Sequence, residues 1–460
     1  MAQAAAGPAV AVRPSAAART VVACLAVALC GTAWLVDPAA QASFDAPKRT
    51  IALFAIGAAA AALVWQRVPG RWRQLANTLQ QPGTSRRLAL GCLCAALLAL
   101  AGLLISTVLA DQPASAWPGL RVQLLYLLLL PLGATRALDG AGARRVFAAA
   151  VAAVGINALL SLLQSAGMPL PLGVSQLGGR YPTGALLGNE AYVALACALL
   201  GAAGVALGLT VATPRARWLG WGLLGLGVAV IALNRQTTAA AALFAAAATL
   251  FALRWRGTRR LLPAAVLLAL LLPLSAAVPA LRTQTWARLP YTAEHYQQLT
   301  TYRLGAWAAA LEMVRSRPWT GHGPGSYAEQ SQTQRFAAEI ALKQRLAPAP
   351  PGTYFVQAHQ EYLQLAAESG LPVLLAVLAA LCCLLAGLLR LARRAAALEA
   401  RVLLGVLVAG MIAALAWFPL QIPLLAVMLL LACGRAWRLL LTDADVESHT
   451  TAQRRAEKAA

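Results

Sequence analysis

The apolar positions of this chain fall into long runs separated by short polar segments. Twelve of these runs are apolar enough to predict membrane-spanning helices. They are rich in Ala and Leu and do not alternate every second residue, as the strands of a membrane barrel would. The pattern therefore predicts an all-α polytopic membrane protein with about 12 transmembrane helices. The predicted spans cover residues 21–36, 51–65, 88–110, 120–135, 146–166, 191–212, 218–233, 239–253, 261–278, 372–389, 402–418 and 420–434.

One polar segment is much longer than the others and divides the chain. Residues 1–278 hold the first nine predicted spans, and residues 279–371 form the large loop. Residues 372–435 hold the last three spans, and residues 436–460 form a tail that we expect to be disordered after residue 440. The first apolar run lacks a clear small-residue cleavage site, so we expect an uncleaved span rather than a signal peptide.

Charge gives this topology an orientation. The chain carries 38 Lys and Arg against 16 Asp and Glu, for a net charge of +22. On a soluble protein that excess would suggest nucleic acid, but here most basic residues fall in alternate connections between spans. This bias predicts that both termini lie in the cytoplasm and that the 279–371 loop lies on the outer face. The eight cysteines all lie in apolar runs without metal-ligand spacing, which predicts packing residues rather than a metal site.

Several polar residues interrupt the outer connections. Arg180 lies between two spans, Asn189 stands where a span opens, and Arg235 lies in a tight turn between two apolar runs. An arginine beside the membrane is costly unless it reaches the headgroups or meets an anion. Two guanidinium groups from different loops could bind one diphosphate, because each can pair with two phosphate oxygens. The alternative is that Arg235 is a turn residue in contact with lipid headgroups.

The large loop predicts a helix that begins at Arg303 and ends before Pro318. Its apolar stripe could lie on the membrane or on the other loops. The glycine-rich turn at 321–325 lacks the Lys and Ser/Thr of a phosphate-binding P-loop, so we interpret it as structural. Its His322 could be an exposed turn side chain. The stripe consists of Leu304, Trp307, Ala308, Leu311 and Val314.

The segment HQEYLQLAAESGLP places His359 directly before a helical pattern and the next span. A neutral imidazole near the start of a helix can accept a proton from a hydroxyl group. A purely structural histidine is the alternative interpretation.

Four segments together resemble the bacterial O-antigen ligase and polymerase superfamily. The segment HQEYLQLAAESGLPV resembles a signature of His, then Asn, Ser or Gln, nine residues and Gly, here His359, Gln360 and Gly370. Val373 departs from the usual Gly, Thr or Tyr at its last position. The other segments are RLGAWAAALEMVRSRPWTGHGPGSY, similar to an Arg-x-x-x-Trp helix and a Pro-x-x-Gly-x-Gly turn, GNEAYVA, and NRQTTAAAALF.

This resemblance implies an inner-membrane glycosyltransferase of GT-C type whose helical periplasmic loop lies between two late spans. It would take a glycan from undecaprenyl diphosphate and transfer it to a lipid A-core hydroxyl, as an inverting ligase without metal or other cofactor. His359 would be the general base, and Arg180, Arg235 and Arg303 would bind the donor diphosphate. Gln360, Asn189 and His322 would position the substrate.

Other functions remain open at this level. A polysaccharide polymerase or a protein O-oligosaccharyltransferase of the same superfamily would share the donor and differ only in the acceptor. A lipid-linked glycan transporter would need ionisable residues near the membrane midplane and two related halves, and the sequence shows neither pattern. A membrane scaffold would leave the polar residues of the outer connections without a role.

Overall fold

The structure is a computed structural model, and it describes residues 15–39, 43–65, 83–168, 183–254, 303–342, 355–394 and 397–459, with side chains described as far as residue 444. The predicted span 261–278 and Arg180 lie outside the described residues. So do the beginning of the predicted loop and its later part at 343–354.

The described chain is helical and contains no strand. Ten helical segments within it are long and apolar enough to cross a membrane, which confirms the predicted all-α polytopic class. The eleventh predicted span corresponds to a shorter helix, α18. The ten are α1 (Ala16–Trp34), α2 (Asp45–Trp65), α4 (Thr84–Val108), α5 with α6 (Pro113–Leu127 and Leu129–Gly133), α7 (Ala141–Ser165), α8 (Glu190–Thr210), α9 (Pro214–Leu233), α10 (Thr237–Arg254), α17 (Leu371–Ala392) and the first part of α19 (Pro423–Ala459). The shorter α18 covers Leu398–Ala413.

Helix α8 is the most buried span and packs against α7, α9, α10 and α18. Small residues allow these helices to approach closely. A Cβ atom on Gly204 of α8 would lie 2.6 Å from the Gly220 carbonyl oxygen of α9, so this crossing requires glycine. The same close packing makes α8 and its neighbours a rigid support for the connections at their ends.

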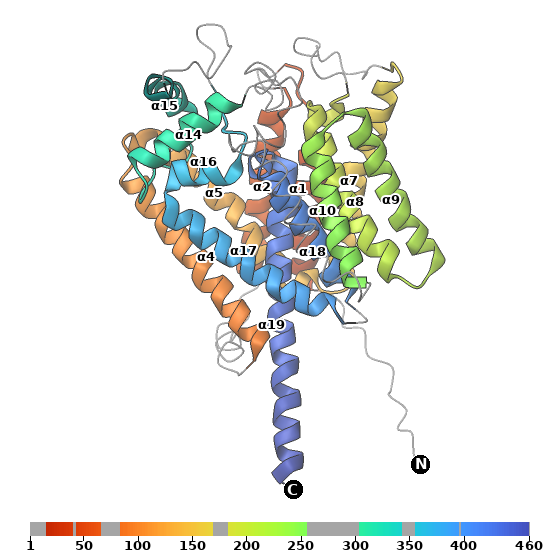
Figure 1. The fold of residues 1–460 in the computed structure, drawn as a ribbon. Coiled ribbons are helices and arrows are strands. Elements are labelled where there is room, and N and C mark those ends of the chain that lie inside the picture. Colours follow the sequence, from red (N-terminus) through yellow and green to blue (C-terminus); the bar gives the residue numbers. More distant parts are fainter. Residues whose placement is uncertain are drawn as a thin grey trace, which may run out of the picture.

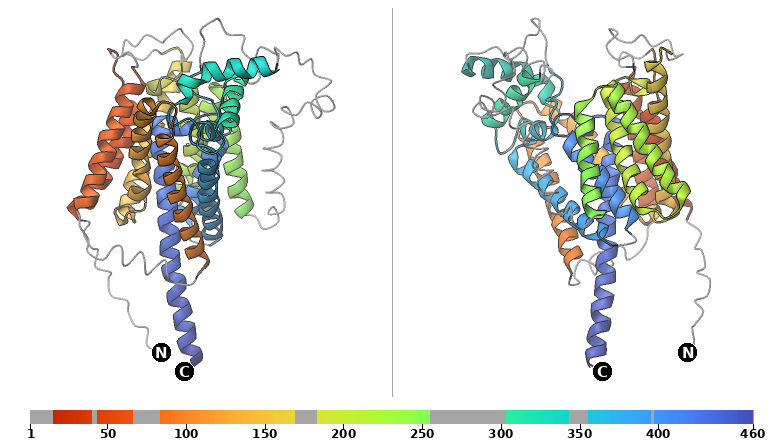
Figure 2. Two further views of the ribbon diagram at one scale, coloured as in Figure 1. Left: turned by 90° about the vertical axis from the view of Figure 1, so that its left-hand side faces the viewer. Right: turned by 45° about the vertical axis from the view of Figure 1, so that its right-hand side comes forward.

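The bundle has two different ends. The loop helices α14 (Leu304–Ser316), α15 (Tyr327–Leu342) and α16 (Glu361–Ser369) lie together at one end, which we call the loop end (Figure 1). The last part of α19 projects beyond the bundle at the opposite end, which we call the tail end (Figures 1 and 2). The large loop and the C-terminal helix therefore extend from opposite ends of the molecule.

The structure corrects two expectations about the C-terminal region. Helix α18 ends at Ala413 rather than near 418, and a turn with a short 3-10 helix, η5 (Pro419–Gln421), follows it. Proline disfavours helical conformation in the residue before it, so the helix cannot continue through Phe418. The tail after 440 is not disordered, because α19 continues to Ala459. No Pro or Gly follows Gly434, so nothing in the sequence ends this helix.

The buried face of α14 also differs from the expected stripe. Its buried residues are mostly small, and Ala310 and Met313 pack with Tyr327, Ala358 and Ala367. Leu311 of the predicted stripe is 42% exposed. Small side chains allow α14 to approach α15 and α16 closely, so burial here follows side-chain size rather than hydrophobicity alone.

Candidate functional site

His359 lies immediately before α16 in a backbone conformation that is rare for its residue type. Its φ is +54°, and the next residue, Gln360, is the N-cap of the helix. The Gln360 side-chain oxygen accepts a hydrogen bond from the Leu363 N–H. Gln360, which is predicted to position substrate, therefore also caps α16 directly after the strained backbone of His359.

Two aromatic rings from the α18–α19 connection enclose the His359 imidazole. The centroid of His359 lies 5.3 Å from Trp417 and 4.9 Å from Phe418, with an interplanar angle of 71° to each. Trp417 and Phe418 stack on each other, and Phe418 contacts Tyr192 of α8 edge-on. Residues that are distant in sequence thus form one wall around the histidine. In the described part of the chain, its buried Nδ1 has no hydrogen-bond partner.

Arg303 is the predicted donor-binding arginine that the structure brings to this histidine. Its guanidinium carbon lies 4.2 Å from the Trp417 ring centroid, and its Nη1 donates to the Ala416 carbonyl oxygen at 2.8 Å. A cation over the face of an indole is attracted by the ring's quadrupole. Arg303 and His359 therefore contact the same indole ring.

This environment favours neutral imidazole. Burial lowers the pKa of His359 from 6.5 to about 4, and the nearby Arg303 cation lowers it further within that shift. The ring is consequently a proton acceptor throughout the physiological range, although a weak one in this state. A histidine whose pKa burial shifts this far, beside a cation, is typical of a functional site.

Glu361 fastens the α18–α19 connection to the start of α16. Its backbone N–H donates to the Ala414 and Trp417 carbonyl oxygens, at 2.9 and 3.1 Å. Its carboxylate accepts from the Leu420 N–H at 3.0 Å. Burial raises the pKa of this carboxyl group to about 7. Glu361 thus holds the aromatic wall in place with a group that titrates near neutrality.

A second polar cluster lies at the same end, where α7, α8, α9 and α10 meet. The Asn234 amide donates to the Glu190 carbonyl oxygen at 3.2 Å, and its oxygen accepts from Thr183 at 2.7 Å. Asn189 caps α8 by accepting from the Ala191 N–H at 2.8 Å. Arg235 is exposed in the turn that follows Asn234, with φ of +49°. Asn234 thus ties the Arg235 turn to the start of α8.

Tyr192 connects the two clusters, because it lies in the first turn of α8 and contacts Phe418. Arg235 and Asn189 therefore share the loop end with His359. The described contacts bring only Arg303 directly beside it. Arg180 lies outside the described residues, so its predicted role stays untested.

His322 has a different position from the one expected. It is 5% exposed rather than a solvent-facing turn residue. Its Nδ1 lies 3.1 Å from an Asp111 carboxylate oxygen, and its Nε2 lies 2.9 Å from the Ser316 hydroxyl. These contacts fasten the glycine-rich turn to the α4–α5 connection and to the end of α14. Its predicted role in substrate positioning stays a prediction.

The glycine-rich turn docks on the end of α16. The Gly323 N–H donates to the Glu368 carbonyl oxygen at 2.8 Å. Gly321 has φ of +65°, and a Cβ there would lie 2.4 Å from that same carbonyl group. Only glycine fits both the conformation and the space. This confirms the structural interpretation of the turn.

Sequence reasoning missed several residues of this end, above all Trp417, Phe418 and Glu361. An aromatic pair followed by proline between two spans was the available signal for the first two. Glu361 had no such signal, because its role depends on contacts with residues about sixty positions away.

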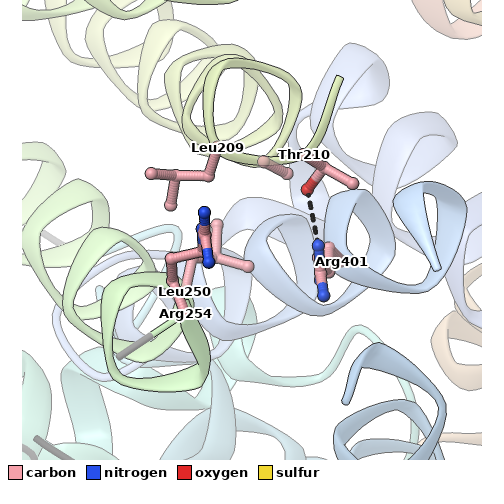
Figure 3. Close-up of a pocket in the computed structure, with 6 residues that line it drawn as sticks. Leu209, Thr210, Leu250, Arg254 and Arg401 are labelled. Carbon is pink, nitrogen blue, oxygen red and sulfur yellow. Dashed lines mark hydrogen bonds between the residues drawn. The ribbon is translucent and has the colours of Figure 1, made fainter. Parts of the chain in front are cut away.

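A small pocket lies at the tail end, away from these residues. Figure 3 shows the side chains that line it. Arg401 donates there to the Thr210 hydroxyl at 3.1 Å. None of the residues around His359 lines it, so it is separate from the candidate site. Its lining residues are Ala206, Leu209, Thr210, Leu250, Arg254 and Arg401.

Fold and site together define a multi-pass membrane protein with a buried histidine, an arginine and an aromatic wall at one end of its helical bundle. The family model described as O-antigen ligase matches residues 222–378. This match supports assignment to the O-antigen ligase and polymerase superfamily. The matched region contains Arg235, Arg303 and His359 but not Trp417 or Phe418. Comparison with curated proteins gave no match.

Proposed function

We propose that this protein is an O-antigen ligase of the GT-C type in the bacterial inner membrane, with its loop end facing the periplasm and both termini in the cytoplasm. It transfers a glycan from undecaprenyl diphosphate to a sugar hydroxyl group of lipid A-core. The observation that carries the proposal is the joint placement of Arg303 and His359 on the Trp417 ring, since both residues lie within the segment that matches the ligase family.

His359 acts as the base in a single displacement. The acceptor hydroxyl oxygen attacks the anomeric carbon, and its proton passes to the imidazole. The bond between that carbon and the diphosphate oxygen breaks, and the diphosphate leaves with the electron pair. Inversion at the anomeric carbon follows from one displacement. General-base catalysis of this kind contributes about 10²–10⁴-fold.

Arg303 binds the diphosphate and stabilises the negative charge that develops on it. Arg180 and Arg235 are the further donor-binding candidates, from separate connections. Asn189, Gln360 and His322 are the candidates for substrate positioning. The reaction as proposed needs no metal, because guanidinium groups neutralise the leaving group.

Donor binding would also strengthen the base. The Arg303 cation lowers the pKa of His359 in the free protein, in addition to burial. A dianionic diphosphate on Arg303 offsets that positive charge and raises the pKa of the imidazole towards neutrality. His359 thus becomes an effective base once the donor is in place.

The test is transfer by the protein reconstituted in vesicles with an undecaprenyl-diphosphate glycan. Lipid A-core, a second lipid-linked glycan and a protein with accessible Ser and Thr are offered as acceptors, and products are identified by mass spectrometry. We expect glycosylated lipid A-core, and about 10²–10⁴-fold less of it with His359→Ala. Arg144→Ala, at an exposed tail-end position of α7, is the control and should retain the wild-type rate.

Each other product identifies an alternative. Longer lipid-linked glycan indicates the polymerase, and glycosylated protein indicates the oligosaccharyltransferase. Glycan flux without a covalent product indicates a transporter and overturns the proposal. An unchanged rate with His359→Ala removes the histidine from the base role.

A further inference from the structure

The strained backbone at His359 needs support from its surroundings. A non-glycine residue at positive φ costs on the order of 1–3 kcal/mol and persists only when neighbouring contacts hold it. Among the described residues, none accepts or donates at the ring's Nδ1. No carboxylate of the described residues therefore orients this nitrogen, unlike in an Asp-His pair. The Trp417 and Phe418 rings limit the tilt of the imidazole, and the backbone conformation of His359 sets the position of the ring.

Gln364 holds the backbone immediately before His359. Its side-chain oxygen accepts a hydrogen bond from the Ala358 N–H at 2.9 Å. Gln360, immediately after His359, is fixed as the N-cap of α16. Gln364 belongs to the same helix and is 6% exposed. The histidine is thus held from both sides by the first two turns of α16.

Glu368 fixes which way the Gln364 amide points. The Gln364 Nε2 donates to the Glu368 carboxylate at 3.0 Å, so its oxygen must face Ala358. The carboxylate also accepts from the Gly325 N–H at 2.9 Å and from the Tyr327 N–H at 3.3 Å. Burial raises the pKa of Glu368, and the three N–H donors oppose that rise. An unbroken chain of hydrogen bonds thus connects the glycine-rich turn to the backbone at His359.

We infer that Gln364 is a positioning residue that sets the imidazole of His359 for proton transfer, with Glu368 orienting Gln364. The inference rests on the proposed function of His359 as the base. It also gives the turn at 323–327 a consequence for catalysis, because the Gly325 and Tyr327 N–H groups hold the Glu368 carboxylate. A displacement of about 1 Å at a catalytic group can cost about 10²-fold in rate.

Gln364→Met tests the inference, because it keeps the length of the side chain and removes both hydrogen-bonding groups. We expect kcat for glycan transfer to fall about 10–10²-fold, while KM for the lipid-linked donor changes less than about threefold. Hydrogen exchange at the Ala358 amide, measured on the folded protein, should become faster because its acceptor is gone. A fall in kcat without faster exchange would overturn the inference.

A matched control exists on α7. The Gln164 oxygen accepts from the Ala185 N–H at 2.8 Å, and Ala185 also has positive φ, +46°. Gln164→Met therefore removes a hydrogen bond that a backbone N–H donates to a side-chain oxygen, at a residue with positive φ. It should lower Tm about as much as Gln364→Met and leave kcat within about threefold of wild type. Equal losses of kcat in the two variants would reduce Gln364 to a general stabiliser.

Double variants separate positioning from destabilisation. In a His359→Ala background, Gln364→Met should lower the residual rate by less than about twofold, because the group that it positions is absent. A full additional loss contradicts the inference. Should Gln364→Met fail to fold, Glu368→Gln replaces it, with an expected fall in kcat of about tenfold and the same exchange readout. An unchanged kcat in Glu368→Gln overturns the inference.

The outcomes also separate this inference from the proposed function. No transfer by the wild-type protein, or wild-type transfer by His359→Ala, rejects the function itself. Loss with His359→Ala and a normal kcat with Gln364→Met rejects only the positioning role.

Discussion

The charged residues around Arg435 at the tail end and those around His359 at the loop end are arranged in opposite ways. At the tail end, Arg435 of α19 is 9% exposed and pairs with Asp139 and Glu399, each at 2.6 Å. Asp443 there accepts from Ser85 at 2.7 Å and pairs with Arg394. Charges from different helices are matched, which is typical of residues that hold a bundle together.

At the loop end, positive charge and imidazole lie next to each other instead. Arg303 meets an aromatic face and a carbonyl oxygen, and its charge disfavours protonation of His359. Three non-glycine residues of the described chain have positive φ, namely Ala185, Arg235 and His359, and all three lie in connections or loops at this end. Backbone strain in the described chain is thus concentrated at the loop end, which is typical of functional sites. The comparison shows that the tail end stabilises the bundle through matched charges, and it agrees with the proposal that binding and chemistry take place at the loop end.

Arg303→Ala should have the largest effect of the single changes that test this comparison. We expect transfer to fall about 10²-fold, because the leaving diphosphate loses a charged partner. The acid limb of kcat/KM, near pH 4 in the wild type because burial and Arg303 lower the pKa of His359, should move to higher pH. The pH profile of kcat/KM for both proteins measures this. An acid limb near 6.5 in the wild type contradicts the assignment, and Arg303→Lys should retain most of the low pKa.

Arg435→Gln tests the tail end. It leaves two carboxylates without their shared cation, and we expect it to lower the free energy of unfolding by about 2 kcal/mol, less than for a fully buried pair because both partners are partly exposed. The kcat per folded molecule should stay at the wild-type value. Thermal unfolding and transfer are measured on the same sample, and a large loss of kcat at unchanged Tm would erase the distinction between the ends.

Glu361→Gln should change how stability depends on pH. The folded-state pKa of Glu361 is raised from 4.5 to about 7. Its protonated form therefore contributes stability that is fully present below 4.5 and lost as pH rises through about 7. His359 acts oppositely, since its lowered pKa contributes stability above 6.5 that is lost as pH falls towards 4. The wild type should therefore lose stability between pH 5 and pH 7.5 as Glu361 ionises, and Glu361→Gln should not lose this contribution. The Tm of Glu361→Gln minus the Tm of the wild type should thus increase over this range. A constant difference would contradict this.

Trp417→Phe should have the smallest effect on stability. The Trp417 Nε1 is buried, and no described residue accepts its hydrogen bond. Phenylalanine removes the unsatisfied donor but also fills less space than the indole, so the two effects offset and the free energy of unfolding should change by less than about 1 kcal/mol. A fall in transfer rate at unchanged Tm would show that catalysis needs the whole indole, through its N–H or through its contacts with Arg303 and His359. A clear loss of Tm would contradict the expected small effect.

The sequence predicted ten of the twelve spans because hydrophobic length is a local property, while span 261–278 lies outside the described residues. It also predicted α14, the glycine-rich turn and the start of α16, each from its own residues. It did not predict that Trp417 and Phe418 enclose His359, because that contact joins segments almost sixty residues apart. The buried face of α14 was predicted wrongly for a different reason. Small residues are buried where helices approach closely, and hydrophobic periodicity takes no account of side-chain size.

The central claim is that proton transfer at the loop end depends on His359. The most direct measurement is the single-turnover rate of glycan transfer by His359→Gln at saturating lipid-linked donor. Arg435→Gln is measured separately, in vesicles of the same composition, as the control. The account predicts a rate about 10²-fold or more below wild type for His359→Gln, with unchanged donor affinity, and a wild-type rate for folded Arg435→Gln. A wild-type rate for His359→Gln would contradict it.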